Sequence, residues 1–190
     1  FENLSKLTSV DYGRGVRHQS FVDAPPTAGD AFINGDWATV LVGGLGGGGK
    51  GIFALNITDP STFAEANAGA LVLWEYTPAD DIADNSITNS RLGYTYPQPA
   101  IVRMQNGRWA AVVSNGYNSE AGTSAVFVID LETGESIAVF DTKKGPSDDP
   151  SPTASGGRPN GMAIASPVDL DGDRTVDLIY AGDLFGNVWK

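Results

Sequence analysis

Short runs of β-branched and aromatic residues alternate along the chain with turns rich in Gly, Asn, Asp and Pro. Several of these runs end at a glycine, which is typical of buried β-strands. No long stretch shows the 3.6-residue spacing of apolar positions that predicts an amphipathic helix. The pattern therefore predicts an all-β fold.

One of the strand-like runs occurs three times. Residues 37–44 (Trp-Ala-Thr-Val-Leu-Val-Gly-Gly) match residues 109–116 (Trp-Ala-Ala-Val-Val-Ser-Asn-Gly) and, more loosely, residues 175–182 (Thr-Val-Asp-Leu-Ile-Tyr-Ala-Gly). The copies are about 70 residues apart, which is longer than a compact β-propeller blade of about 40–50 residues. The extra length falls in loops, mainly at residues 78–92 and 143–159.

Each copy has one predicted strand before it and up to two after it. These strands lie at about 30–33, 51–57, 71–77, 99–104, 124–130, 136–141, 162–168 and 187–190. Four antiparallel strands per unit are typical of a β-propeller blade. The predicted blade-like units span about 20–78, 93–142 and 160–190. Because a propeller closes with roughly four to eight blades, we expect residues 1–190 to form about three blades of one incomplete ring, within a larger propeller.

Composition narrows the possible chemistry. The 190 residues carry a formal net charge of −11, no cysteine and one histidine, His18, which is expected to be exposed or structural. The lack of cysteine excludes disulfides and thiolate zinc sites, and the negative charge disfavours nucleic-acid partners. No apolar stretch of about 18 residues predicts a transmembrane segment.

Two other features favour structural roles over functional ones. Residues 44–51 resemble a phosphate-binding Gly-x4-Gly-Lys loop, but Gly51 stands where Ser or Thr is needed and a strand follows. A hairpin connection is the preferred interpretation. The four tryptophans lie in predicted strands, where we expect packing between blades rather than an exposed sugar-stacking platform; they are Trp37, Trp74, Trp109 and Trp189.

The sharpest candidate site is an acidic loop. Asp169, Asp171, Asp173 and Asp177 occupy positions 1, 3, 5 and 9 of this loop, and the carbonyl of Thr175 stands at position 7. Alternating carboxylates can turn several oxygens toward one hard cation, and calcium suits such ligands. The corresponding turns of the first two units are Asn-Gly pairs at 34–35 and 106–107.

The loop departs from the EF-hand pattern, which has Gly at position 6 and Glu at position 12. Here Arg174 and Tyr180 occupy those positions, and Gly172 stands at position 4. A short calcium loop between strands is the preferred interpretation, with a plain acidic hairpin as the alternative. Asp80, Asp81 and Asp84 lack such spacing and are interpreted as solvated.

The strands also resemble known propeller families. Residues 127–135 contain Asp130, Thr133 and Gly134 in the Asp-x-x-Thr-Gly arrangement of quinoprotein-like propellers, a group that includes enzymes, assembly factors and adhesins. A more specific resemblance, to the C-terminal propeller of the PilC/PilY family of type IV pilus biogenesis factors and tip-associated adhesins, runs through most of the chain. The segments that carry it are Phe21-Val22-Asp23 with Gly29-Asp30-Ala31, residues 37–55, residues 92–99, residues 115–119 and residues 167–189.

The resemblance implies a calcium-binding, non-enzymatic propeller on the bacterial cell surface, at the pilus tip or outer membrane, exported through the periplasm. Such a protein supports pilus assembly, counters retraction and contributes to attachment. Implied partners are pilins or minor pilins and host-surface receptors. Implied calcium ligands are Asp169, Asp171, Asp173, Thr175 and Asp177.

Two other functions remain open at this point. A pyrroloquinoline quinone-dependent dehydrogenase shares the repeat but needs a cofactor pocket on a closed ring, for which the sequence shows no matching constellation. A scaffold module of an outer-membrane assembly machine would share the fold. Association with pilins or with barrel-assembly components would separate the latter from a pilus protein.

Overall fold

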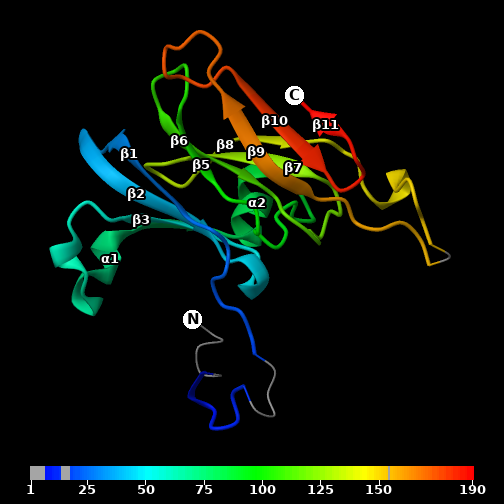
Figure 1. The fold of residues 1–190 in the computed structure, drawn as a ribbon, viewed down its shortest axis with the longest axis horizontal. Coiled ribbons are helices and arrows are strands. Elements are labelled where there is room, and N and C mark those ends of the chain that lie inside the picture. The colour runs from blue at the N-terminus through cyan, green and yellow to red at the C-terminus, as the bar shows by residue number, and fades with distance from the viewer. Residues whose placement is uncertain (1–6, 14–17, 154) are drawn as a thin grey trace.

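The computed structural model describes residues 7–13, 18–153 and 155–190, and three antiparallel sheets dominate it (Figure 1). The first sheet has the order β1-β2-β3-β4 and the second β5-β6-β7-β8, whereas the third contains β9, β10 and β11. The strand bounds are Thr27–Ile33, Asp36–Gly44, Ile52–Asn56, Val72–Tyr76, Ala100–Arg103, Trp109–Ser114, Ala125–Asp130, Ser136–Asp141, Met162–Val168, Leu178–Asp183 and Val188–Trp189. The all-β prediction is confirmed, and the sheets do not close into a ring within the described residues.

The second sheet is buried on both faces. Successive side chains of a strand point to opposite faces, and in β7 Phe127 and Ile129 join a core shared with the first sheet. Val126 and Val128 join a second core shared with the third sheet. Two apolar interfaces therefore hold the three sheets together in chain order.

The first strands of successive sheets lie close together, since β1 contacts β5 and β5 contacts β9. In each sheet the first strand pairs with the second through a turn. The turns β1–β2, β5–β6 and β9–β10 therefore lie along one edge of the assembly. The acidic loop and the two Asn-Gly turns therefore lie along the same edge of the three sheets.

The predicted loop at residues 78–92 begins with a helix, so that prediction was wrong at this point. Helix α2 spans Pro78–Asn85. Thr77 caps it: the Thr77 backbone N–H and hydroxyl donate to Oδ2 of Asp80 at 2.8 and 2.6 Å. A capping box followed by proline at the first helical position is a local start signal for a helix.

Other helical segments are short. Helix α1 spans Ala68–Leu71, and 3-10 turns occupy Gly46–Gly48, Pro60–Thr62, Glu65–Asn67 and Pro146–Asp148. No helix among the described residues is long and apolar enough to cross a membrane.

Asp81 is completely buried, which contradicts the solvated position predicted for it. Its carboxylate accepts hydrogen bonds from the Ser90 hydroxyl at 3.0 Å and from the Arg91 backbone N–H at 2.6 Å. It also forms an ion pair with Nη2 of Arg91 at 2.6 Å. Asp84, by contrast, is exposed. The carboxylate of Asp81 is stable there because a cation and two further donors replace its hydration.

The buried pair connects to the sheets through Asn115. The amide nitrogen of Asn115 donates to the carbonyl of Arg91 at 2.8 Å. Its oxygen accepts the backbone N–H groups of Ala125 at 3.1 Å and Met162 at 3.0 Å. One side chain thus bridges the segment after α2, the second sheet and the start of the third.

The tryptophans do not share one environment. Trp74 is 7% exposed, and its Nε1 donates to the carbonyl of Leu131 at 3.0 Å, so the predicted packing between blades is confirmed there. Trp37 is 61% exposed, so the predicted packing between blades holds there only in part. Trp37 lies at the start of β2 and meets the second sheet through an edge-on contact with Trp109, at 6.0 Å between ring centroids, which leaves most of its surface uncovered.

The glycine-rich connection is confirmed as a link between β2 and β3. Its glycines allow a close approach of the preceding segment, since a Cβ added at Gly48 would lie 1.9 Å from the carbonyl oxygen of Phe21. The backbone N–H of Gly47 donates to Oδ1 of Asp23 at 2.6 Å. Packing by Phe21 and Asp23 therefore accounts for Gly46 and Gly48 of this connection.

We expect Asp81→Ala to lower the free energy of unfolding by about 3–5 kcal/mol, because it leaves the buried Arg91 guanidinium without its counter-charge. Asp84→Ala removes an exposed carboxylate and should cost less than about 1 kcal/mol. Urea denaturation of both variants measures the difference. Equal stabilities would show that the Asp81–Arg91 pair does not stabilise the fold.

Candidate metal centre

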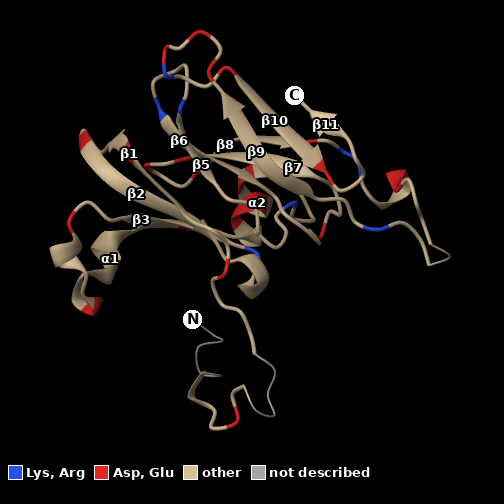
Figure 2. Ribbon diagram, viewed as in Figure 1, with Lys and Arg blue, Asp and Glu red and all other residues tan. Residues whose placement is uncertain are grey.

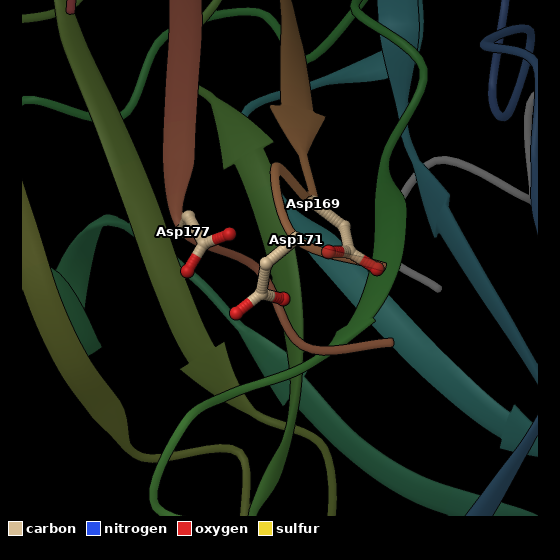
Figure 3. A group of neighbouring side chains, drawn as sticks. All are labelled: Asp169, Asp171 and Asp177. Atoms are coloured by element: carbon tan, nitrogen blue, oxygen red, sulfur yellow. The ribbon is translucent and has the colours of Figure 1, made fainter. Parts of the chain in front are cut away.

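The acidic loop joins the ends of β9 and β10 (Figure 3). Asp169 follows β9 directly and Asp177 immediately precedes β10. The backbone N–H of Asp177 donates to the carbonyl of Val168 at 3.0 Å, which closes the base of the loop. Figure 2 shows acidic residues on many loops, and a group of them in this one.

Three of the predicted ligands come together. One carboxylate oxygen from each of Asp169, Asp171 and Asp177 lies within 4.8 Å of the other two. In Figure 3 the three side chains lie side by side along the loop. Asp169 and Asp171 are exposed and Asp177 is half-buried, so water and ions reach the group from one side.

Backbone donors hold these carboxylates in place. Asp169 accepts the N–H groups of Gly172 at 2.7 Å and Arg174 at 2.8 Å. Asp177 accepts the N–H of Leu170 at 2.8 Å. These hydrogen bonds arrange the loop around its own aspartates, and each carboxylate retains lone pairs for a further partner.

The loop also contacts the second sheet. Nε2 of Gln105, in the turn between β5 and β6, donates to Oδ1 of Asp177 at 2.9 Å. The backbone N–H of Val176 donates to the carbonyl of Arg103 at 2.9 Å. No local sequence pattern predicts the Gln105 contact, because it joins residues of different repeats.

Asp173 lies outside the group of three. Its Oδ1 accepts the backbone N–H of Thr175 at 2.7 Å and the Thr175 hydroxyl at 2.6 Å. These hydrogen bonds, with a contribution from the charge of Arg103, lower the pKa of Asp173 below its ordinary value. Thr175 itself is buried. The role of its carbonyl as a calcium ligand stays a prediction.

Arg174 adopts a left-handed backbone conformation, with φ +70°, although it carries a side chain. This residue stands at position 6 of the loop, where the EF-hand pattern uses glycine for a sharp turn. The backbone turns in spite of the substitution, and Gly172 supplies a second positive φ of +82°. The arginine therefore strains the loop without preventing the convergence of the aspartates.

The arrangement can hold a hard cation. All three converging groups are oxygen ligands, which suit calcium or magnesium and do not suit softer metals. Without a cation, carboxylate charges at this spacing repel one another by about 1 kcal/mol per pair in water. A calcium ion would remove this repulsion and could complete its shell with water and further oxygens.

The chain is similar to known β-propeller domains. The family model of the PilY1 β-propeller domain matches residues 1–190. The chain is 43% identical over 188 residues to a type IV pilus biogenesis factor PilY1 homolog of Xylella fastidiosa, covering 99% of this chain and 12% of that protein. It is 40% identical over 190 residues to the type IV pilus biogenesis factor PilY1 of Pseudomonas aeruginosa strain UCBPP-PA14, covering 100% and 14%.

A solved structure shows the same fold. The chain matches the crystal structure of the Pseudomonas aeruginosa PilY1 C-terminal domain with a TM-score of 0.70 and 38% identity, covering 88% of this chain and 29% of that one. The chain spans only 12% and 14% of the lengths of the two curated relatives.

We expect Arg174→Gly to be more stable than Arg174→Ala by about 1 kcal/mol, because only glycine adopts a positive φ without steric cost. Both variants remove the same charge, so the comparison isolates the backbone effect. Thermal unfolding without added metal measures it. If the alanine variant is at least as stable, the turn at this position is not strained.

Proposed function

The chain belongs to the family of PilY1 β-propeller domains, and we propose that it is a calcium-binding, non-enzymatic module that serves type IV pilus biogenesis. The relatives described above are named as pilus biogenesis factors. Because the chain covers a small part of their length, the role of the whole protein is part of this proposal. In it, the protein acts at the bacterial cell surface, at the pilus tip or outer membrane, after export through the periplasm.

The observation that carries the calcium proposal is the convergence of Asp169, Asp171 and Asp177 in one turn. The equivalent turns of the first two sheets are compact Asn-Gly turns, with positive φ at Asn34, Gly35 and Gly107. An acidic loop in one sheet alone is better explained by a bound ion than by solubility. Asp173 and Thr175 remain predicted ligands, although the loop holds Asp173 in other contacts.

Calcium at this loop would act on more than the loop itself. Gln105 connects Asp177 to the turn of the neighbouring sheet, so an ion bound by Asp177 would also restrain that turn. In our proposal, calcium occupancy stabilises this face of the propeller for contact with pilins or minor pilins. Support for assembly, opposition to retraction and a contribution to attachment follow from that contact.

The two alternative functions make different demands. A pyrroloquinoline quinone-dependent dehydrogenase would bind its quinone and oxidise substrate in dye-linked assays, whereas neither relative's name states an enzymatic activity. An outer-membrane assembly scaffold would co-purify with barrel-assembly components. Isolation of the tagged intact protein with pilins or minor pilins supports the pilus proposal over both.

We expect calcium to bind the intact protein saturably, and Asp171→Asn to weaken this binding at least about tenfold, because an amide oxygen carries no charge for the cation. Asp173→Asn should weaken binding less, since Thr175 already occupies the Asp173 carboxylate. Calorimetric titration after removal of bound metal measures both affinities. Absence of binding in the folded wild-type protein would reduce the loop to an acidic hairpin.

The same substitution tests the link to pilus function. In cells that carry the intact protein, we expect Asp171→Asn to change surface piliation and calcium-dependent retraction. Asp84→Asn, an exposed acidic residue remote from the loop in sequence, provides the control. If Asp171→Asn abolishes calcium binding but leaves piliation and retraction unchanged, the metal site does not serve the pilus role.

A further inference from the structure

Three aromatic side chains gather at the boundary between the first and second sheets. Phe32 and Trp37 flank the turn between β1 and β2, and Trp109 begins β6. The ring of Trp37 lies edge-on to that of Phe32 at 5.8 Å between centroids, and to that of Trp109 at 6.0 Å. Phe32 is 48% and Trp37 61% exposed. We call Phe32, Trp37 and Trp109 the aromatic group.

A polar cavity of about 240 Å³ lies beside the aromatic group. Phe32 and Trp109 form part of its wall, and the charged side chains of Arg108, Asp130 and Glu132 form another part. Trp37 does not line the cavity and lies against it through its ring contacts with Phe32 and Trp109. The volume accommodates a single sugar ring but not a folded segment of a partner protein. Aromatic and polar surface therefore meet at one small site.

The polar side of the cavity is fixed by contacts within the fold. Asp130 is buried, forms an ion pair with Nη2 of Arg108 at 2.5 Å and accepts the backbone N–H groups of the following turn. Oε2 of Glu132 accepts the backbone N–H of Asn34 at 3.0 Å, across the boundary between the sheets. The cavity is therefore preformed, and both sheets contribute to it.

Hydrogen-bonding capacity remains for a ligand. Among the described residues, Nη1 and Nε of Arg108 and Oε1 of Glu132 have no hydrogen-bond partner. The site thus offers donors and an acceptor side by side, beside exposed aromatic rings. A hydroxyl group matches this mixture because it both donates and accepts.

We propose that the aromatic group and its cavity bind a neutral sugar residue of a glycan. The C–H face of a sugar ring would stack on the exposed rings, while its hydroxyls would bond to Arg108 and Glu132. This site is separate from the acidic loop and depends neither on calcium nor on the pilus role proposed above. The ligand class proposed for this surface is therefore a neutral sugar.

Charge argues against an anionic ligand. Two carboxylates against one guanidinium leave the cavity with an excess negative charge, and the chain carries a net charge of −11. A phosphate or sialic acid would be repelled. A cationic side chain would lie beside the guanidinium of Arg108, which carries the same charge and would repel it. A purely apolar ligand would leave Arg108 and Glu132 without partners, at a cost in affinity.

The test uses the intact protein and methyl glycosides of glucose, mannose and galactose, together with N-acetylglucosamine. Saturation-transfer NMR should show contact through sugar C–H protons, and tryptophan fluorescence should give a saturable titration. We expect Phe32→Ala to weaken binding about tenfold or more, because Phe32 is the exposed aromatic residue of the cavity wall, and Phe32→Tyr to retain most of it. Glu132→Gln keeps a side-chain oxygen for Asn34 and should weaken binding by removing the charged acceptor.

Phe140→Ala is the matched control, because Phe140 on β8 is another exposed aromatic residue, 59% exposed and outside this cavity. Unchanged thermal unfolding of each variant confirms that it is folded. Titrations repeated with calcium and with a chelator should agree, which separates this site from the acidic loop. Trp109 lines both this cavity and another beside Asp169, so it is not used as a variant.

Three outcomes would overturn the proposal. No saturable binding of any of the four sugars would exclude the ligand class. Binding that is equally strong in Phe32→Ala would locate the sugar outside this cavity. Binding of a short lysine-containing peptide at Trp37, without sugar binding, would show a contact surface for protein partners instead.

Discussion

The fold depends on the burial of the second sheet between its two neighbours. Strand β7 contributes alternate side chains to two separate cores, with Phe127 and Ile129 on one face and Val126 and Val128 on the other. Such burial stabilises each large side chain by roughly 1.5–3 kcal/mol. This double interface fixes the order and spacing of the sheets, and with them the positions of all the turns at their edges.

A buried polar network fixes the position of the sheets relative to one another, which apolar packing alone does not do. Hydrophobic contact alone does not fix how far one sheet is displaced along another. Asp81, Arg91 and Asn115 supply directional contacts from the segment after α2 to the second sheet and to Met162 at the start of the third. Because each buried polar group needs its partners, small displacements of the sheets would be costly.

Both proposed sites follow from this geometry, since they form where turns of neighbouring sheets meet. The acidic loop belongs to the third sheet, and Gln105 of the second sheet contacts it. The aromatic group combines Phe32 and Trp37 of the first sheet with Trp109 of the second. In each case one sheet supplies the main side chains and its neighbour holds them in place. A propeller scaffold can therefore carry different binding chemistries on one edge through changes in its turns.

The sequence by itself determined the local features of this protein: its strands, the repeat that relates them, the glycine-rich connection and the aspartates of the acidic loop. The strands, the connection and the acidic loop follow from short-range patterns of two to nine neighbouring residues, and the repeat follows from comparing such patterns about 70 residues apart, which is why they could be predicted. Only the tertiary structure decided which charged and aromatic side chains are buried. It placed Asp81 inside the fold and left Trp37 exposed, and it brought Asp169, Asp171 and Asp177 together without Asp173. The physical reason is that burial and convergence depend on contacts between sheets that are far apart along the chain, and local periodicity carries no information about those contacts.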